Sequence, residues 1–287
     1  MSLTERQNEM LTMARTNGRL SVDALASAFD VTPQTIRRDL NDLCLRGLLT
    51  RVHGGAMAPT SVGNVDYDDR RNLALEEKQR IGVEAASLIP DNCSLILNIG
   101  TTTEQVARSL YERHDLVVIT NNINVVNILR GSTTTKELIL AGGIVRQVDG
   151  GIVGDAAVDF IRQFKVDWAV IGASALDEDG AILDFDYREV AVARAIVENA
   201  RRVILVADHH KFERTAPVRI CGLEKIDVFV TDREPPARFR AACARDGVDL
   251  RVTPAPDALR DDGDEGGDEG RDGDSASQRS EDDNVRA

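Results

Sequence analysis

Polar side chains near the start of the chain share one face of a predicted helix. In the stretch TPQTIRRDLNDL, the positions i, i+3, i+4 and i+7 hold Gln34, Arg37, Arg38 and Asn41, which therefore point outward together. In the DNA major groove, arginine pairs with guanine and glutamine with adenine through two hydrogen bonds, and other arginines bind phosphates. The pattern predicts DNA binding rather than an ordinary solvated face, through Gln34, Thr35, Arg37, Arg38, Asn41, Arg51 and His53.

A second set of residues fits a phosphorylated small molecule. In NIGTTTEQVA, a glycine lets the backbone come close to a ligand, and three threonines follow at an expected helix N-terminus, where the helix dipole favours an anion. Other predicted strand ends carry TNN, LAGGIVR and ADHHKF. Each stretch alone also fits a turn or a cap, but together they favour a phosphate site. Its expected residues are Gly100, Thr101, Thr102, Thr103, Asn121, Asn122, Gly142, Gly143, Arg146, Asp208 and Lys211.

Other kinds of site find little support in the sequence. A metal pair at His209 and His210 lacks a third ligand, and adjacent residues point apart, so we expect no metal. No Walker motif, Ser-His-Asp spacing or Gly-x-Gly-x-x-Gly motif is present, and we expect no cofactor and no catalytic residues. The four cysteines are far apart, which favours buried thiols over disulfides or zinc ligands.

The DNA-binding residues require a small helical domain, expected over residues 1–58. Thr4 and Gln7 can form a capping box for a first helix, Ser21 can cap a second, and Thr32 can cap the third, with Pro33 in its first turn. Two glycines after a short strand, Leu48 to Val52, would close a wing. This order predicts a winged helix-turn-helix, with the helix-turn-helix at about 20–39.

Residues 59–75 are rich in Pro, Ser, Gly and Asp, and we expect a linker there. From 76 to 254, short apolar strands alternate with helices, which predicts a doubly wound α/β domain with a mostly parallel sheet. Ligands of such sheets collect at the carboxyl ends of the strands, where the expected phosphate residues stand.

The chain has 287 residues and a net charge of −13, and the charge is uneven. Residues 1–60 carry +1, whereas residues 255–287 carry −8 with almost no apolar side chains, so we expect a disordered acidic tail. Few of the basic residues are Lys, which fits either a high-salt cytoplasm or a GC-rich genome. The sequence contains no apolar run long enough to span a membrane and no signal pattern, so we expect a cytoplasmic protein.

The motifs VTPQTIRRDLNDL and LLTRVHGGA resemble those of the DeoR family of bacterial and archaeal transcription regulators. The likeness continues through EEKQRIG, NIGTTTEQVA, VITNNINVVN, LAGGIVRQVDGGIVG, GAILDFDYREV and VADHHKF, and it covers about residues 1–233. It implies a winged helix-turn-helix joined to a phosphosugar-sensing domain similar to the sugar-phosphate isomerase fold. The acidic tail has no counterpart in the family.

By this likeness, Gly100 to Thr103 and Lys211 would hold the ligand phosphate. The pocket would be completed by Asn121, Asn122, Gly142, Gly143 and Arg146. Ribose-5-phosphate isomerases have a Gly-Ala-Asp turn that supplies an acid to the pocket. The comparable turn in this sequence is Gly172-Ala173-Ser174, which favours binding without turnover.

Two functions follow as hypotheses. The first is a repressor of glycerol or hexose catabolic genes that binds an inverted repeat in double-stranded operator DNA as a dimer or tetramer. A phosphorylated sugar or polyol would relieve repression; the resemblance implies glycerol 3-phosphate, although fructose phosphates fit the same site. The alternative is a sugar-phosphate isomerase-like enzyme with an accessory nucleic-acid-binding module, in which Asp208, Glu189 and Lys211 would be acid–base groups.

Overall fold

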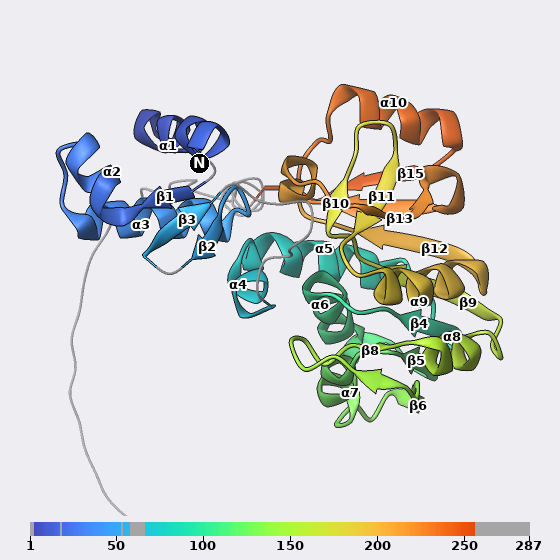
Figure 1. Ribbon diagram of the computed structural model, residues 1–287. Coiled ribbons are helices and arrows are strands. Elements are labelled where there is room, and N and C mark those ends of the chain that lie inside the picture. Colours follow the sequence, from blue (N-terminus) through green and yellow to red (C-terminus); the bar gives the residue numbers. More distant parts are fainter. Residues whose placement is uncertain (1–2, 18, 53, 58–66, 256–287) are drawn as a thin grey trace, which may run out of the picture. The chain divides into compact units, whose positions relative to one another are not determined.

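The computed structural model describes residues 3–17, 19–52, 54–57 and 67–255 (Figure 1). The chain divides into two compact units, Met1–Thr253 and Pro254–Ala287. The acidic tail, for which we expect disorder, lies almost entirely outside the described residues. The first unit holds a helix-turn-helix region, up to residue 57, and an α/β region that we call the sensor domain, from residue 67.

Three helices form the helix-turn-helix region: α1 (Glu5–Asn17), α2 (Val22–Ala28) and α3 (Pro33–Leu45). The capping box is confirmed, because the backbone N–H of Gln7 donates to Thr4 Oγ1 at 3.2 Å and that of Thr4 to Gln7 Oε1 at 3.0 Å. Thr32 also caps α3 by accepting from the backbone N–H of Thr35. The predicted side-chain cap by Ser21 is wrong: Ser21 precedes α2 but makes no capping hydrogen bond.

The expected wing is present as the hairpin of β2 (Thr50–Val52) and β3 (Gly55–Met57). The sequence did not predict a third strand, β1 (Arg19–Ser21), which pairs antiparallel with the other side of β3. Gly55 permits this pairing, since a Cβ at this position would lie 1.8 Å from the carbonyl oxygen of Leu20. The wing is thereby attached to the residues that lead into α2.

A core of its own holds these elements together, centred on Met10, Leu25, Ile36, Leu40 and Leu43. Leu40 is fully buried, so Leu40→Ala should destabilise this region by about 2–5 kcal/mol through lost burial and a cavity. Urea unfolding followed by far-ultraviolet circular dichroism should show an earlier helical transition. The fluorescence of Trp168, the chain's single tryptophan, should keep its midpoint because Trp168 belongs to a sensor-domain core.

The exposed residue Asn41 provides the control, since Asn41→Ala should leave both transitions in place. A shift of the Trp168 transition equal to that of the helical transition would contradict the separate core.

The sensor domain is built on a parallel sheet of seven strands in the order β15-β14-β12-β9-β4-β5-β6. Their bounds are β4 (Ser94–Leu97), β5 (Leu116–Thr120), β6 (Thr135–Leu140), β9 (Val166–Ile171), β12 (Ala200–Val206), β14 (Val228–Thr231) and β15 (Asp249–Val252). The order reverses direction between β4 and β9, which is the doubly wound arrangement predicted from the sequence. Ligands of such sheets bind beside this switch point.

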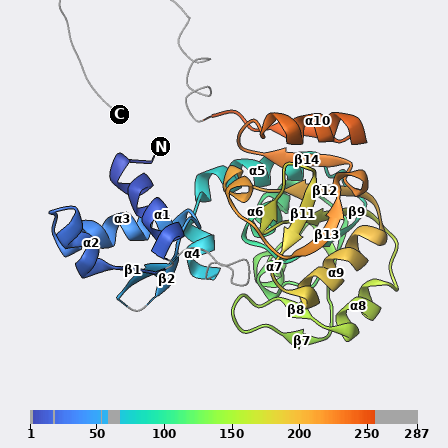
Figure 2. The same ribbon diagram turned by 45° about the horizontal axis from the view of Figure 1, so that its top comes forward.

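Helices cover both faces of the sheet (Figures 1 and 2). Leu95 and Leu97 pack with α5 (Leu75–Ser87), α6 (Thr101–Ser109) and α7 (Ile123–Leu129), whereas Ile96 belongs to the core with α8 (Asp155–Ile161), α9 (Tyr187–Glu198) and α10 (Ala237–Asp246). Alternate residues of β4 therefore face opposite cores, as a strand covered on both faces requires.

Several elements of the sensor domain were not predicted. They are helix α4 (Tyr67–Asn72), the hairpin β7 (Ile144–Val145) and β8 (Ile152–Val153), and a small antiparallel sheet of β10 (Ala175–Leu176), β11 (Ala181–Asp184) and β13 (Val218–Gly222). Short 3₁₀ helices are η1 (Leu110–Glu112), η2 (His209–Glu213) and η3 (Leu223–Lys225). Because α4 lies in the segment 59–75, the second half of the expected linker is partly helical.

All four cysteines are free thiols. Cys44 and Cys243 are buried as expected, whereas Cys93 and Cys221 are half-buried. In Cys221 burial raises the pKa of the thiol to about 12, so that thiol is protonated and unreactive near neutral pH.

Candidate functional site

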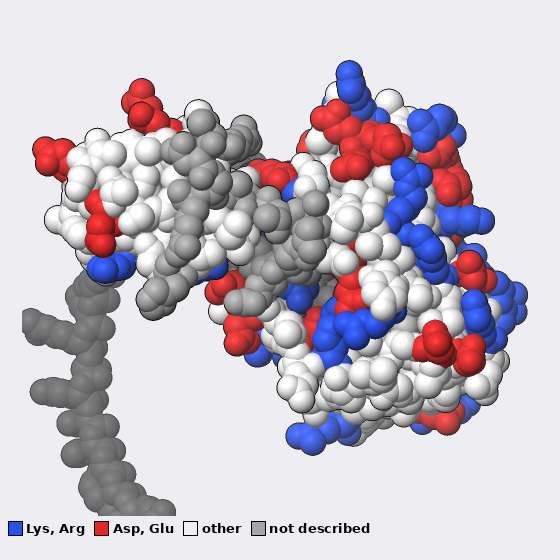
Figure 3. All heavy atoms as spheres, in the orientation of Figure 1, with Lys and Arg blue, Asp and Glu red and all other residues white. Residues whose placement is uncertain are grey.

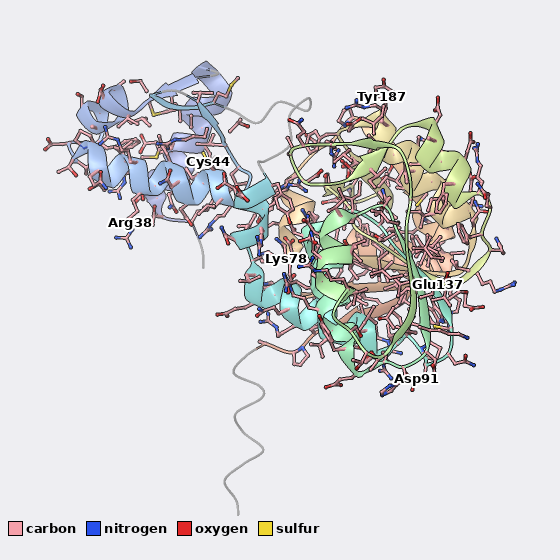
Figure 4. All side chains as sticks on the ribbon, turned by 90° about the horizontal axis from the view of Figure 1, so that it is seen from below. Arg38, Cys44, Lys78, Asp91, Glu137 and Tyr187 are labelled. Atoms are coloured by element: carbon pink, nitrogen blue, oxygen red, sulfur yellow. The ribbon has the colours of Figure 1, made fainter. Side chains whose placement is uncertain are left out.

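Helix α3 presents the polar face that the sequence predicts. Gln34, Arg37, Arg38 and Asn41 are exposed, while Ile36, Leu40 and Leu43 on the opposite face are fully buried. Figure 4 shows Arg38 projecting away from the helix into open space. In the part of the chain that the structure describes, Arg37 and Arg38 make no ion pair, which leaves both guanidinium groups available to a duplex.

Two contacts with α1 fix the rotation of α3. The Nε of Arg6 donates to Asp39 at 2.6 Å, and Nε2 of Gln7 donates to Asp42 at 2.9 Å. Asp39 is nearly buried, so the acidic residue next to Arg38 is neutralised within the domain and does not face a nucleic acid.

The remaining expected DNA contacts occupy different positions. The Thr35 hydroxyl lies 2.9 Å from the Thr32 hydroxyl, so it takes part in the helix cap and is only half exposed. Arg51 is exposed on β2 of the wing. His53 lies outside the described residues.

In the sensor domain, the glycine-threonine stretch forms the N-terminus of α6 at the switch point. Gly100 adopts φ 146°, a conformation that favours glycine, and Thr101, Thr102 and Thr103 are buried in the first turn. The first intrahelical bond runs from the N–H of Glu104 to the carbonyl of Gly100, so the three threonine N–H groups before it have no helical partner. The hydroxyl of Thr103 is used within the turn, where it donates to the carbonyl of Asn98 at 2.8 Å.

A buried group of charges gathers around Asp208, just after β12. Lys78, Asp208 and Lys211 are each at most 8% exposed. Burial lowers the pKa of Lys211 to about 7 and that of Lys78 to about 8. Burial would raise the pKa of Asp208, but the neighbouring Lys211 and Lys78 outweigh it and lower this pKa to about 2. We call Lys78, Asp208, Lys211 and the first turn of α6 the anion site.

Buried polar atoms at this edge of the sheet have hydrogen-bonding capacity to spare. Within the described residues, Asn98 Oδ1, Asp208 Oδ2 and Thr231 Oγ1 have no hydrogen-bond partner. They follow or end the strands β4, β12 and β14. Buried polar atoms in proteins are nearly always paired, so a polar ligand at this edge would satisfy a need that the fold leaves open.

The asparagines and glycines of the expected pocket make hydrogen bonds and packing contacts within the loops that surround it. Asn121 donates through Nδ2 to the carbonyl of Ile152 at 3.1 Å, and Asn122 caps α7 through Oδ1. Gly143, at φ 151°, packs against Ile152 and Val153, where a side chain would collide, and Gly142 is exposed. These residues therefore position the β5 and β6 loops.

Arg146 is surrounded by acids. Its guanidinium pairs with Asp149 and with Glu189, each at 2.5 Å, and lies 3.6 Å from Asp186. Although burial opposes it, Asp149 and Glu189 raise the pKa of Arg146. Burial and the nearby Asp184 raise the pKa of Glu189 to about 8. We expect Arg146 to order this loop, because a phosphate bound there would meet the same acids.

Lys78 was not among the predicted site residues, although the stretch EEKQRIG carries a signal for it. Lys78 stands with Ile81, Gly82 and Ala85 at i, i+3, i+4 and i+7, so a lysine occupies the apolar face of its helix. A buried lysine on such a face requires an anionic or polar partner. Asp184 was also missed; it is buried beside Ser174 of the Gly-Ala-Ser turn, and burial raises its pKa.

The two histidines have other partners. His209 Nδ1 lies 2.7 Å from Asp232, and His210 Nδ1 lies 3.3 Å from Glu213. Over the described ranges, no group of three or more His, Cys, Asp or Glu side chains is placed to hold a metal ion.

Figure 3 shows acidic and basic side chains interspersed over the visible face of the sensor domain.

Two family models match the chain: a DeoR-like helix-turn-helix domain at residues 6–62 and a DeoR C terminal sensor domain at residues 73–233. The chain belongs to the DeoR family of transcriptional regulators. Its α3 is therefore the second helix of a DeoR-type helix-turn-helix, and the α/β region is a DeoR sensor domain.

The relatives to which this DeoR-family regulator is similar are named as transcriptional repressors. The chain is 44% identical to the glycerol-3-phosphate regulon repressor of Escherichia coli over 82% of this chain and 93% of that repressor. It is 44% identical to the repressor of the same name from Haemophilus influenzae, covering 82% and 91%. The HTH-type transcriptional repressor GlcR of Bacillus subtilis is 32% identical, covering 87% and 96%. The protein is thus a transcriptional regulator rather than an enzyme.

Among solved structures, ribose 5-phosphate isomerase A of Methanocaldococcus jannaschii is similar at 16% identity, with a TM-score of 0.37. That match covers 48% of this chain and 55% of the isomerase. Among the described residues, no helix is long and apolar enough to cross a membrane.

Proposed function

We propose that this protein represses genes of glycerol or hexose catabolism and that a phosphorylated sugar or polyol relieves the repression. The buried anion site carries this proposal. Two buried lysines, Lys78 on α5 and Lys211 after β12, neighbour the single carboxylate of Asp208, and α5 packs against α6, whose first N–H groups lack helical partners. Such a site suits a phosphoryl group, because backbone N–H groups and ammonium groups together bind a dianion. The name of two similar proteins, glycerol-3-phosphate regulon repressor, supports the choice of glycerol genes.

On the DNA side, Gln34, Arg37, Arg38 and Asn41 would contact base edges and phosphates of a double-stranded operator. One α3 covers only one half-site, so a repressor of this type would bind an inverted repeat as a dimer or tetramer in the cytoplasm. Binding of the effector would favour an arrangement of lower operator affinity. A coupling of about 1–3 kcal/mol, or about 5–150-fold in affinity, would suffice for regulation.

The effector can be found by a thermal-shift screen of the full chain with phosphorylated and unphosphorylated compounds. We expect glycerol 3-phosphate, glucose 6-phosphate or fructose 1-phosphate to raise the unfolding temperature, and glycerol, glucose and fructose to have no effect. A ligand at 100 times its Kd adds about 2.7 kcal/mol of stability, a shift that is easily measured. Stabilisation by the unphosphorylated compounds alone would contradict a site specific for phosphate.

A further inference from the structure

Helix α4 is the first described element after the wing, and it lies beside α6 of the same sensor domain (Figure 1). The hydroxyl of Tyr67 lies 2.9 Å from Glu104 Oε2 and 3.1 Å from Oε1, and it accepts a hydrogen bond from Asn124 Nδ2 at 3.0 Å. Glu104 directly follows Thr103 in the first turn of α6. The start of α4 is thereby joined to the helix turn that would hold the effector phosphate.

The middle of α4 is joined to the acid-rich loop. Arg70 pairs with Asp149 at 3.3 Å, and the same carboxylate pairs with Arg146 at 2.5 Å. Asp149 is nearly buried, so this ion pair is shielded from water and from salt.

The end of α4 is held by Lys78, whose ammonium is buried within the anion site. Lys78 Nζ donates to the carbonyl of Leu73 at 2.6 Å and to the carbonyl of Arg70. These carbonyls belong to the last turn of α4 and the residue that follows it, where a cation is favourable. An ammonium has three N–H donors, so Lys78 keeps one for an anion.

We propose that α4 is the element through which the effector acts on the DNA-binding region, with Lys78 serving the effector phosphate and the end of α4 at once. This inference rests on the proposed function. Because the Lys78 ammonium would bind both the effector phosphate and the end of α4, a bound phosphate keeps Lys78 in place and stabilises the contact with α4. A bound α4 in turn favours effector binding. Ligand occupancy thus changes how tightly α4, the first described element after the wing, is held.

The first experiment needs no effector. Hydrogen exchange of the full chain should show faster exchange at the backbone amides of residues 67–74 in Lys78→Met, by about tenfold or more. Lys225→Met removes an exposed lysine far along the chain and should leave these amides unchanged. Equal protection of residues 67–74 in Lys78→Met and in the wild type would overturn the proposal.

The second experiment measures coupling, with glycerol 3-phosphate and glucose 6-phosphate as probes. Without effector, Tyr67→Phe and Arg70→Gln should bind the operator as tightly as the wild type does. The factor by which effector reduces operator affinity should be at least about threefold smaller in these variants than in the wild type. The matched controls are Tyr111→Phe, whose hydroxyl contacts Ile128 instead, and the exposed Arg71→Gln. Variants that release DNA as the wild type does would refute α4 as the coupling element. If neither probe releases the wild-type protein from operator DNA, the proposed class of effector is refuted instead. The hydrogen-exchange result would still test whether Lys78 holds α4 against the sensor domain.

Discussion

Replacing Arg37 and Arg38 together by alanine should abolish specific operator binding. Both guanidinium groups are exposed on α3 and make no ion pair among the described residues. An arginine that pairs with a guanine contributes about 1–3 kcal/mol of discrimination, and loss of a phosphate contact weakens binding to all sequences. We expect each single variant to lose about 5–150-fold in affinity for the chain's own upstream region, measured by fluorescence anisotropy with labelled duplexes.

The salt dependence separates the roles of the two arginines. Replacing the arginine that binds a phosphate should reduce the slope of log affinity against log salt concentration by about one. Replacing an arginine that reads a base should relax sequence specificity at one operator position. Arg130→Ala removes an exposed arginine from the sensor domain and should bind DNA as the wild type does. Unchanged affinity in both α3 variants would show that another surface of the protein reads the operator.

Lys211→Met should produce a repressor that binds DNA but ignores its effector. The side chain lies buried beside Asp208 and Lys78, far along the chain from α3. Removing its charge takes away one of two ammonium groups that would hold the phosphate, so effector affinity should fall by about 100-fold, as expected for a buried charge-assisted contact. Isothermal titration measures this loss, and DNA release should fail at effector concentrations that suffice for the wild type.

The same variant should also change how the stability of the chain depends on pH. The pKa of Lys211 is about 7 in the folded chain, below its usual 10.5, so the unfolded chain binds more protons between these values. Stability of the wild type should therefore rise as the pH increases from about 7 towards 10. Lys211→Met should lack this part of the rise, which thermal unfolding of both proteins at pH 7 and at pH 9 measures; an equal rise in the variant would contradict it.

Effector binding has the opposite dependence on pH, because it needs the charged lysines. Raising the pH from 7 to 9 should weaken effector binding as Lys211 and Lys78, with pKa values of about 7 and 8, lose their protons. Lys136→Met, at an exposed position of β6, should change neither stability nor effector binding. A Lys211→Met protein that responds fully to effector would place the phosphate elsewhere.

The sequence predicted those features that depend on local rules. The capping box at Thr4 and Gln7, the cap at Thr32 and the exposed face of α3 follow from spacing alone. The strands Leu116–Thr120 and Val228–Thr231 coincide with short apolar runs of the sequence, since continuous apolar runs between turns leave little ambiguity. The strand ends that carry the anion site follow from the parallel topology.

Features that depend on distant contacts could not be predicted in this way. β1 has three residues and exists because Gly55 lets β3 approach Leu20. α4 is short, polar and without a buried residue, and its contacts are made by Tyr67 and Arg70 with side chains 37 and 79 positions away. Arg146 fits a phosphate ligand in sequence, but three acids from two segments of the chain surround it in the structure.

The most direct test measures operator affinity with and without effector on the same duplex. Purified full-length protein is titrated onto its own upstream region and onto a scrambled duplex of equal length, and each titration is repeated with the best phosphorylated compound from the thermal screen. We expect a preference of at least about 10³-fold for the native fragment, as is usual for specific repressors, and a loss of about 5–150-fold with effector. Equal affinity for both duplexes, or a native affinity that no phosphorylated compound lowers, would contradict a repressor controlled through the anion site.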